Sequence, residues 1–272
     1  MQGRSTAAPP AELDQLAVQD VAGATIAGDS IAGAAEPTPG IAVAGLCKRF
    51  GPVQALDEVH LCVPLGTMTA LVGRNGAGKS TLIRILATSV RPDAGAVAVG
   101  GHDVETDAKG VRRQIGLALG EDRSFFWRLN GRKNLAFFAR LYGLGRRTVA
   151  QRVEQVLAAV ELLEVADRRV DRYSTGMRSR LGIARALLGD PTVLLLDEPT
   201  RSLDPASSSS VRQLLRSLLA SGERCALLAT HDLAEAVDLA DEIVVLRGGA
   251  VAARHRRPFD MGEIEVDIRG GR

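Results

Sequence analysis

The stretch GRNGAGKST at residues 73–81 constrains the fold most, because its glycines, lysine and hydroxyl residues have the spacing of a phosphate-binding loop. Small residues let consecutive backbone N–H groups converge on oxygen anions. The apolar stretch TMTALV (67–72) before it predicts a strand, and STLIRILATSV (80–90) after it has the spacing of a helix. The N-terminus of such a helix adds N–H donors and a positive dipole end. The sequence therefore predicts a phosphate group bound between a strand and a helix.

Strand and helix patterns alternate along the rest of the chain. Residues 148–163 have a helical period, 192–199 form a continuous apolar run that ends in two acids, and a helix pattern follows from Pro205. A strand pattern at 225–230 comes next, followed by a short helix and two further strands around a Gly-Gly turn at 248–249. This alternation predicts an α/β fold with a parallel sheet, whose ligands lie at the carboxyl ends of the strands.

Composition and hydropathy limit the classes of protein to which the chain can belong. With 272 residues and 46% hydrophobic content, the chain can bury one large core. The first 40 residues are rich in Ala, Gly and Pro and contain no aromatic residue, so we expect them to be disordered. No apolar run approaches the roughly 20 residues of a membrane span, and no basic-then-apolar leader begins the chain. Three cysteines without metal-ligand spacing fit a reducing compartment.

Acidic and imidazole side chains follow the predicted strands on the side where the phosphate loop opens. Asp197 can order Mg²⁺ through water while Ser80 coordinates the ion directly, and Glu198 can polarise an attacking water. Two acids that merely cap a loop are the alternative. His231 ends the next strand and is expected near the γ-phosphate, with a purely structural role as its alternative.

A second anion-binding pattern lies in YSTGMRSRLGIARALLGDP at 173–191, where Ser174 and Gly176 precede a helix. A chain that already has its own phosphate loop has nothing for a second such site to bind. The pattern makes sense if Ser174 and Gly176 face the nucleotide of a neighbouring copy.

With these motifs, the sequence resembles the ATP-binding subunit of an ABC transporter over Ile41 to Pro258. GRNGAGKST resembles the Walker A loop, YSTGM the signature loop, LLLDEP the Walker B segment, SLD (202–204) the D-loop, and His231 the switch histidine. The resemblance implies a RecA-like core with an N-terminal antiparallel β subdomain, a helical subdomain at about 123–190 and a short tail at 259–272. It also implies a head-to-tail homodimer, with two ATP at the interface and the signature loop acting in trans.

The resemblance further implies a set of site residues. Glu198, His231 and Lys79 take the catalytic positions. Ser80, Asp197 and Glu121 take the Mg²⁺ positions. The ATP contacts come from Phe50, which matches the aromatic residue that stacks on adenine, and from Gly73, Arg74, Asn75, Gly76, Ala77, Gly78, Lys79, Ser80, Thr81, Ser174, Gly176 and Asp204.

The sequence departs from the family pattern in two places. Tyr173, Thr175 and Met177 replace the usual Leu, Gly and Gln of the signature loop. The Q-loop glutamine after IGLAL (115–119) is absent, and Glu121, or Asp122 if the alignment shifts by one, is the nearest equivalent. A carboxylate can ligate Mg²⁺ but repels a γ-phosphate more than an amide does.

The aromatic residues are concentrated just after this loop. The chain has six Phe, one Trp and two Tyr, and its single tryptophan, Trp127, lies among the aromatics of 125–142 beside several arginines. Such residues anchor protein interfaces, although Phe137, Phe138 and Tyr142 have the spacing of a helical core as well. Phe126 and Trp127 precede the helix and are the better candidates for a groove that receives the membrane partner.

The sequence as a whole predicts an ATP-hydrolysing subunit, peripheral on the cytoplasmic face of the membrane, that powers a separately encoded transmembrane permease. The segment 115–144 resembles exporter subunits, so export is the expected direction, and the substrate is set by the permease. The alternative is a soluble ABC-type ATPase acting on ribosomes or DNA, although no nucleic-acid partner is expected. A P-loop kinase or GTPase is a third interpretation, but the guanine-reading Asn-Lys-x-Asp motif is absent.

Overall fold

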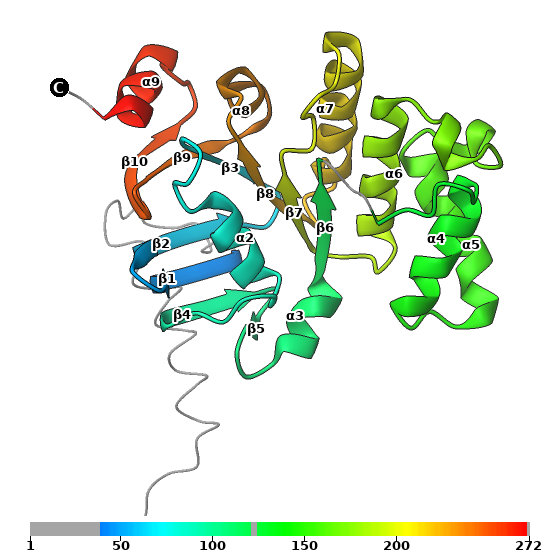
Figure 1. Cartoon of the computed structure of the whole chain (residues 1–272), viewed down its shortest axis with the longest axis horizontal. Coiled ribbons are helices and arrows are strands. Elements are labelled where there is room, and N and C mark those ends of the chain that lie inside the picture. Colours follow the sequence, from blue (N-terminus) through cyan, green and yellow to red (C-terminus); the bar gives the residue numbers. More distant parts are fainter. Residues whose placement is uncertain (1–38, 121–123, 271–272) are drawn as a thin grey trace, which may run out of the picture.

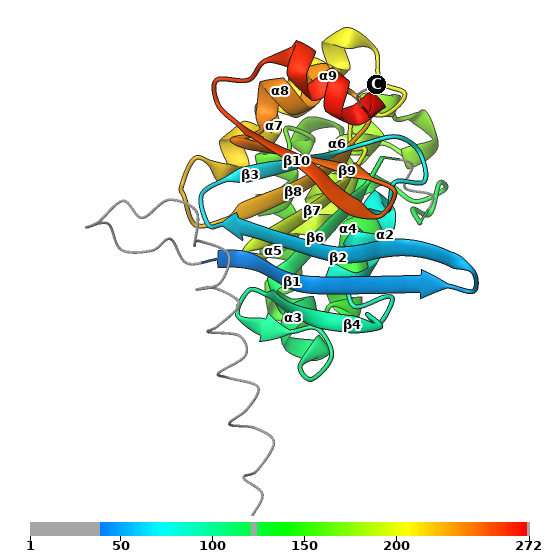
Figure 2. The ribbon, with the colours of Figure 1, turned by 90° about the vertical axis from the view of Figure 1, so that its left-hand side faces the viewer.

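The computed structural model of the chain describes residues 39–120 and 124–270. Figure 1 shows two sheets beside a lobe of helices, and Figure 2 shows the long strands β1 and β2 from the side. One sheet is antiparallel with the order β2-β1-β4-β5, and the other has the order β10-β9-β3-β8-β7-β6. The prediction of an α/β fold with a RecA-like core, an antiparallel N-terminal part and a helical part is confirmed.

The antiparallel sheet packs over helix α2. Its strands are β1 (Pro39–Phe50), β2 (Val53–Pro64), β4 (Ala94–Val99) and β5 (His102–Asp103). Helix α2 (Lys79–Leu86) buries Leu82 and Ile85 in the cluster that also holds inward residues of both sheets. Helix α3 (Ala108–Gln114), capped by the Asp107 side chain, then leads into the second sheet. The helix that carries the phosphate loop is therefore fixed on two sides by apolar packing.

The second sheet is parallel apart from β10, which pairs antiparallel with β9. Its strands are β3 (Met68–Val72), β6 (Ile115–Leu119), β7 (Val193–Asp197), β8 (Cys225–Thr230), β9 (Glu242–Arg247) and β10 (Ala250–Arg256). Every residue of β3 and β8 is buried. In β7, Leu194 and Leu196 face one apolar cluster while Val193 and Leu195 face another, because successive side chains point to opposite faces. Continuous apolar runs are the expected result of burial on both faces.

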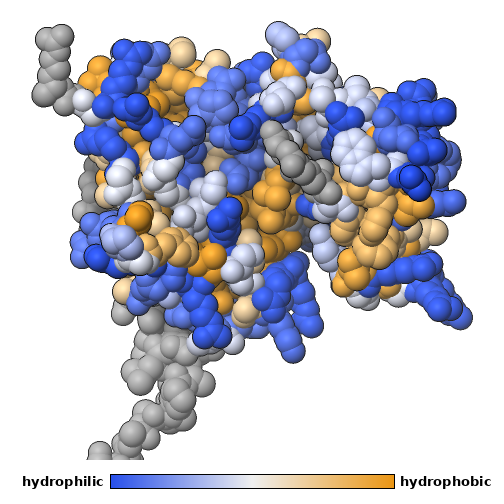
Figure 3. Space-filling view, in the orientation of Figure 1, coloured by the Kyte–Doolittle hydropathy of each residue, from blue (hydrophilic) through white to orange (hydrophobic). Residues whose placement is uncertain are grey.

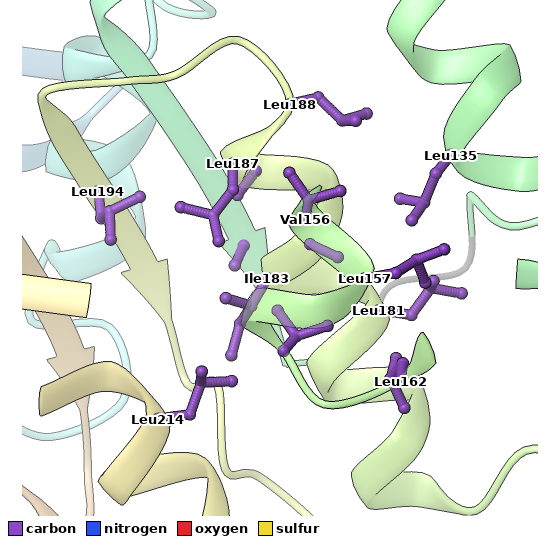
Figure 4. Close-up of a cluster of buried hydrophobic side chains, with 14 of the residues drawn as sticks. Leu135, Val156, Leu157, Leu162, Leu181, Ile183, Leu187, Leu188, Leu194 and Leu214 are labelled. Atoms are coloured by element: carbon purple, nitrogen blue, oxygen red, sulfur yellow. The ribbon is translucent and has the colours of Figure 1, made fainter. Parts of the chain in front are cut away.

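The helical lobe contains α4 (Gly131–Leu141), α5 (Arg146–Ala159), the short turns η1 (Leu163–Val165) and η2 (Val170–Arg172), and α6 (Thr175–Leu187). Figure 4 shows how it joins the sheet: leucines of α4, α5 and α6 meet Leu194 of β7 and Leu214 of α7 (Pro205–Leu219). Helix α8 (Leu233–Leu239) contacts strands β3 and β8. Because α6 packs against both its own lobe and the sheet, the signature stretch at its start is tied to the core.

Several boundaries differ from the sequence-based expectations. Helix α2 ends at Leu86 rather than near Val90, since Thr88 adopts a left-handed backbone with φ 57°. Helix α5 ends at Ala159, just before Glu161 at φ 57°. Strand β1 already begins at Pro39, and residues 1–38, expected to be disordered, lie outside the described residues.

The segment 259–272, expected as a short tail, carries helix α9 (Met261–Arg269). The Asp260 carboxylate caps the helix by accepting hydrogen bonds from Gly262 and Glu263. Ile264 is buried against apolar residues of β9, which is why this segment folds onto the sheet instead of extending away from it.

Candidate functional site

The phosphate loop runs from the end of β3 to the start of α2, as the sequence predicts. Backbone crowding explains two of its glycines. A Cβ on Gly73 would lie 2.2 Å from the Leu246 carbonyl oxygen, and a Cβ on Gly78 would lie 2.5 Å from that of Ala55. Gly78 also has φ 108°, a conformation that L side chains rarely adopt. At Gly73 and Gly78 the loop therefore passes close to the backbones of β9 and β2, which leaves no room for a side chain at these two positions.

Lys79 opens the helix and is 93% buried, with only 7% of its surface exposed. Its Nζ donates to the carbonyl oxygens of Gly73 at 2.6 Å and Arg74 at 3.3 Å. Burial lowers the pKa of Lys79, while the nearby carboxylates of Glu198 and Asp197 act in the opposite direction. The ammonium group is thus held by two carbonyl oxygens of the loop itself.

The two acids lie at the end of β7, next to this loop. Asp197 accepts a hydrogen bond from the Ser80 side chain, and burial raises the pKa of its carboxyl group. Glu198 follows it with a left-handed backbone, φ 52°, and its N–H donates to the Ala229 carbonyl of β8 at 2.8 Å. A non-glycine residue in this conformation marks strain that the surrounding structure must hold in place.

His231 meets Glu198 at the rim of the sheet. Strands β7 and β8 pair in parallel with Asp197 opposite Ala229, so the residues that follow the two strands emerge side by side. His231 Nδ1 lies 2.8 Å from Glu198 Oε1. This distance places the two side chains at one edge of the sheet, as the sequence predicts. Their role near the γ-phosphate stays a prediction, beside the alternative of a purely structural role.

A cavity of about 900 Å³ joins most of the predicted positions. Phe50 lines this cavity with about half of its surface exposed, and Lys48 Nζ lies 5.3 Å from the centre of its ring. The other predicted lining residues are Asn75, Gly76, Ala77, Gly78, Lys79, Ser80, Thr81, Asp197 and Glu198. An adjoining cavity of about 620 Å³ is lined by Asn75, Glu198 and His231 among others. Arg74 faces a third, smaller cavity beside Arg247 and the end of α9.

Other predicted site residues lie away from the cavity that contains Lys79. Ser174 is the N-cap of α6 and accepts a hydrogen bond from Met177 N at 3.1 Å. Asp204 caps α7 in the same way, accepting from Ser207 N at 3.0 Å. A hydrogen bond from the Ser207 side chain, together with this backbone bond, lowers the pKa of the Asp204 carboxyl group. Gly176 packs against Ser207, where a Cβ would approach to 3.0 Å. Glu121 lies outside the described residues.

Sequence reasoning missed Arg201 and Glu235. Arg201 lines both larger cavities and forms an ion pair with Glu198. Glu235 of α8 is buried and accepts a hydrogen bond from Thr200 at 2.6 Å. The only available signal for Arg201 was its place three residues after Glu198. Nothing in the pattern of α8 distinguishes Glu235 from an ordinary surface acid.

The aromatic stretch divides into buried and exposed residues. Phe125 is buried and Phe138 packs against the core of the lobe, whereas Phe126, Trp127, Phe137 and Tyr142 are exposed. The rings of Phe126 and Phe137 pack edge to face with centres 4.9 Å apart. Figure 3 shows apolar surface gathered over the lobe that carries α4. Phe137, Phe138 and Tyr142 all have a spacing that also suits a helical core, but only Phe138 packs against the core of the lobe.

A phosphate loop between a parallel strand and a helix, with two acids at the end of a neighbouring strand, defines a P-loop nucleoside triphosphate hydrolase. Comparison with known proteins narrows the class. The family pattern described as ABC transporter matches residues 56–201. The chain belongs to this family, as an ATP-binding subunit with its ATPase domain.

Named relatives agree with this assignment. The chain is 45% identical over 213 residues to the daunorubicin resistance ATP-binding protein DrrA3 of Streptomyces coeruleorubidus, covering 78% of this chain and 67% of that protein. It is 41% identical over 218 residues to the daunorubicin/doxorubicin resistance ATP-binding protein DrrA of Streptomyces peucetius, covering 80% and 66%. The matched region thus spans about two thirds of the length of these relatives. They do not favour the alternative of an ATPase acting on ribosomes or DNA.

Solved structures agree with the fold. CbiO1 of Clostridium perfringens, part of the ABC transporter complex cbiONQ, superposes with a TM-score of 0.75 at 26% identity, covering 85% of this chain and 95% of that one. A dimeric bacterial ABC transporter cassette superposes with a TM-score of 0.70 at 24% identity, covering 80% and 100%. Within residues 39–120 and 124–270, no helix has the length and apolar character needed to cross a membrane.

Proposed function

We propose that this subunit hydrolyses ATP in the cavity beside the phosphate loop and thereby powers export by a separate transmembrane permease. The observation that carries the proposal is the 2.8 Å contact between Glu198 Oε1 and His231 Nδ1, at the edge where Lys79 and the loop N–H groups also lie. A carboxylate and an imidazole placed beside a phosphate site are suited to orient a water molecule for attack on the γ-phosphate.

Each residue has a distinct role in this proposal. The loop N–H groups and the Lys79 ammonium hold the β- and γ-phosphates, and Phe50 stacks on the adenine. Glu198 orients and polarises the attacking water, while His231 holds the Glu198 carboxylate and reaches toward the γ-phosphate. The proton of the water leaves toward the carboxylate, or toward the phosphate that is released.

The residues present fit a magnesium ion. Ser80 and Asp197 are joined by a hydrogen bond, so a hydroxyl and a carboxylate oxygen already converge beside the loop. Mg²⁺ prefers oxygen ligands and is commonly held by one or two protein groups together with substrate phosphates. When bound, Mg²⁺ supplies positive charge that offsets the charge on the phosphates.

Two substitutions separate binding from hydrolysis. Glu198→Gln should keep ATP affinity, lower turnover steeply and let a nucleotide-bound dimer accumulate, measured by phosphate release and by size-exclusion chromatography. Lys79→Ala should instead weaken ATP binding, because it removes the cation that faces the phosphates. Glu223→Gln, an exposed acid outside both cavities, is the matched control. Normal turnover in Glu198→Gln would remove Glu198 from the proposed role.

Ser174, Gly176 and Asp204 act in trans in this proposal. They do not line the cavity of their own chain, and the N-terminus of α6 offers N–H groups suited to a phosphate from a second copy. Ser174→Arg should abolish hydrolysis while isolated subunits still bind ATP. A mixture of Ser174→Arg and Lys79→Ala proteins should recover part of the activity through one intact composite site. A fully inactive mixture, under conditions that allow subunit exchange, would contradict the proposal.

The exposed aromatic residues of the helical lobe form the docking site for the permease in this proposal, which places the subunit at the cytoplasmic face of the membrane. Trp127 is 46% exposed and stacks under the Arg178 guanidinium at 5.4 Å. Trp127→Ala should leave ATP binding unchanged and weaken copurification with the permease. Val266→Ala, an exposed apolar residue on α9, is the control. Loss of ATP binding together with normal assembly would show that the docking assignment is wrong.

Export is supported by the names of the relatives, which refer to resistance to daunorubicin and doxorubicin, and by the exporter-like segment 115–144. We infer a hydrophobic, drug-like cargo chosen by the permease. The test is to coexpress this chain with its copurifying membrane protein and to measure drug accumulation in inverted vesicles. ATP-dependent accumulation, lost with Glu198→Gln, is expected; ATP-dependent release from the vesicles would reverse the direction.

A further inference from the structure

Arg201 follows Glu198 by three residues, in a tight turn that brings the two side chains together. Arg201 N donates to the Glu198 carbonyl oxygen at 3.0 Å, which closes the turn. The guanidinium Nη1 then lies 3.3 Å from Glu198 Oε2. The left-handed backbone at Glu198 contributes to the contact between the Glu198 carboxylate and the Arg201 guanidinium.

Neighbouring elements hold this turn on both sides. The Ser179 hydroxyl of α6 donates to the Pro199 carbonyl at 2.7 Å. On the other side, the Thr200 hydroxyl donates to the buried Glu235 carboxylate of α8 at 2.6 Å. The backbone from which the Arg201 side chain starts is therefore fixed relative to the sheet.

The two oxygens of Glu198 have different partners. Oε1 is 2.8 Å from His231 Nδ1, whereas Oε2 is buried and has no hydrogen-bond partner among the described residues. The Arg201 guanidinium supplies Oε2 with an opposite charge. Only 17% of the Glu198 side chain is exposed, against 55% of the Arg201 side chain. A buried carboxylate oxygen without a hydrogen bond is costly unless a cation lies close by.

Negative charges near Glu198 would disturb the orientation of its carboxylate. Asp197 lies beside Glu198 at the end of β7, and an arriving triphosphate adds further negative charge to a cavity whose buried cation is Lys79. Like charges oppose ionisation and disturb the orientation of a carboxylate. Arg201 lines this cavity as well as the adjoining one that contains His231, so its charge reaches both.

We propose that Arg201 is a positioning residue for ATP hydrolysis: its guanidinium holds Oε2 of Glu198, and so keeps Oε1 on His231 when phosphate enters the cavity. The proposal rests on the proposed function, since it acts through Glu198. It predicts an effect on turnover rather than on ATP binding, because Arg201 serves the carboxylate and the phosphate loop holds the nucleotide.

The expected effect is moderate. A half-exposed ion pair contributes little to stability, and we expect Arg201→Ala to lower kcat about threefold to tenfold with KM for ATP within about twofold of wild type. At 1.36 kcal/mol for each factor of ten, this equals about 0.7–1.4 kcal/mol of barrier height. Arg201→Lys keeps a cation within reach of Oε2 and should recover most of the loss.

The experiment compares kcat and KM of the full chain and its Arg201→Ala, Arg201→Lys and Arg216→Ala variants. Arg216 is the matched control, because it is half-exposed, pairs with Asp238 and lies outside both cavities. Thermal unfolding checks that each variant is folded, and Arg201→Gln replaces any alanine variant that is not. Unchanged kcat in Arg201→Ala, or equal losses in Arg201→Ala and Arg216→Ala, would overturn the proposal.

A double substitution tests whether Arg201 acts through Glu198. Under single-turnover conditions, Glu198→Gln with Arg201→Ala should be no slower than Glu198→Gln alone, because the carboxylate that Arg201 holds is already absent. An additional threefold or greater loss in the double variant would show that Arg201 acts independently and would refute the assignment. A separate result tests the proposed function itself: if Glu198→Gln hydrolyses ATP as fast as wild type, the proposed role of Glu198 is wrong, whatever the Arg201 variants do.

Discussion

Asn134 carries the most specific prediction for the lobe that displays the aromatic residues. It is completely buried on α4. Its Oδ1 accepts from Phe126 N at 2.8 Å, and its Nδ2 donates to the carbonyl oxygens of Phe126 at 3.1 Å and Asn130 at 3.0 Å. One side chain therefore joins the aromatic loop to the helix behind it.

Asn134→Leu keeps the number of side-chain heavy atoms and the branch at Cγ, and removes all three bonds. The two carbonyl oxygens retain other donors, because Leu129 N bonds to Phe126 O and Asn134 N bonds to Asn130 O. The partly buried Phe126 N–H loses its partner, which costs about 1 kcal/mol, the lower end of the roughly 1–3 kcal/mol for a buried donor, and each of the other two bonds contributes about 0.5–1.5 kcal/mol. We expect the free energy of unfolding to fall by about 2–4 kcal/mol in total, a large share of the roughly 5–15 kcal/mol typical of a domain.

Urea unfolding followed by circular dichroism gives the change in stability, and tryptophan fluorescence reports on the loop directly. Trp127 is the only tryptophan of the chain and lies next to Phe126. Its emission should shift to longer wavelength in Asn134→Leu, before the main transition. Asn130→Ala, which removes the N-cap of α4, should cost only about 1 kcal/mol. A loss below about 0.5 kcal/mol in Asn134→Leu, with unchanged emission, would refute the reasoning.

Three further predictions follow from close contacts and burial. Gly120→Ala should lower turnover at least tenfold, because a Cβ there would lie 1.9 Å from the Glu198 carbonyl oxygen, whereas Gly189→Ala, with nothing within 4 Å, should have normal kinetics. Burial raises the pKa of Glu235 above its ordinary 4.5, so the native state binds this proton more tightly than the unfolded chain. Stability is therefore lost as the pH rises from 4.5 through the raised pKa, and Glu235→Gln, compared with wild type by urea unfolding across that window, should lack this loss. Burial raises the pKa of Cys225 to about 12, so mass spectrometry should find this thiol unalkylated by iodoacetamide at pH 8 until urea unfolds the protein.

Local pattern was enough to predict much of the site. The spacing of the phosphate loop requires few long-range contacts, and continuous apolar runs identified the buried parallel strands. Once strands are parallel, the residues that follow them must meet at one edge, which is why Asp197, Glu198 and His231 could be placed together. Their positions depend on strand order and register, and both follow from burial.

The remainder depends on left-handed backbone conformations and on tertiary contacts, neither of which the apolar pattern encodes. Helix α2 ends at Leu86 although apolar spacing continues to Val90, because the backbone of Thr88 turns away. The contact between Arg201 and Glu198 depends on a left-handed residue that no pattern indicates. The burial of Ile264 requires a surface on β9 that only the folded sheet provides.

The pairing of β7 with β8 also determines which kinds of genetic change this subunit tolerates. Asp197 stands opposite Ala229, and Glu198 and His231 come directly after the two strands. A single codon inserted or deleted within either strand would shift its end by one residue and turn the following side chain to the opposite face of the sheet. A change in length at an exposed turn such as the one at Gly143, between α4 and α5, where an added Cβ would meet nothing within 4 Å, does not shift the end of either strand. Natural variants of the subunit should therefore differ in length at such turns and keep β7 and β8 at constant length.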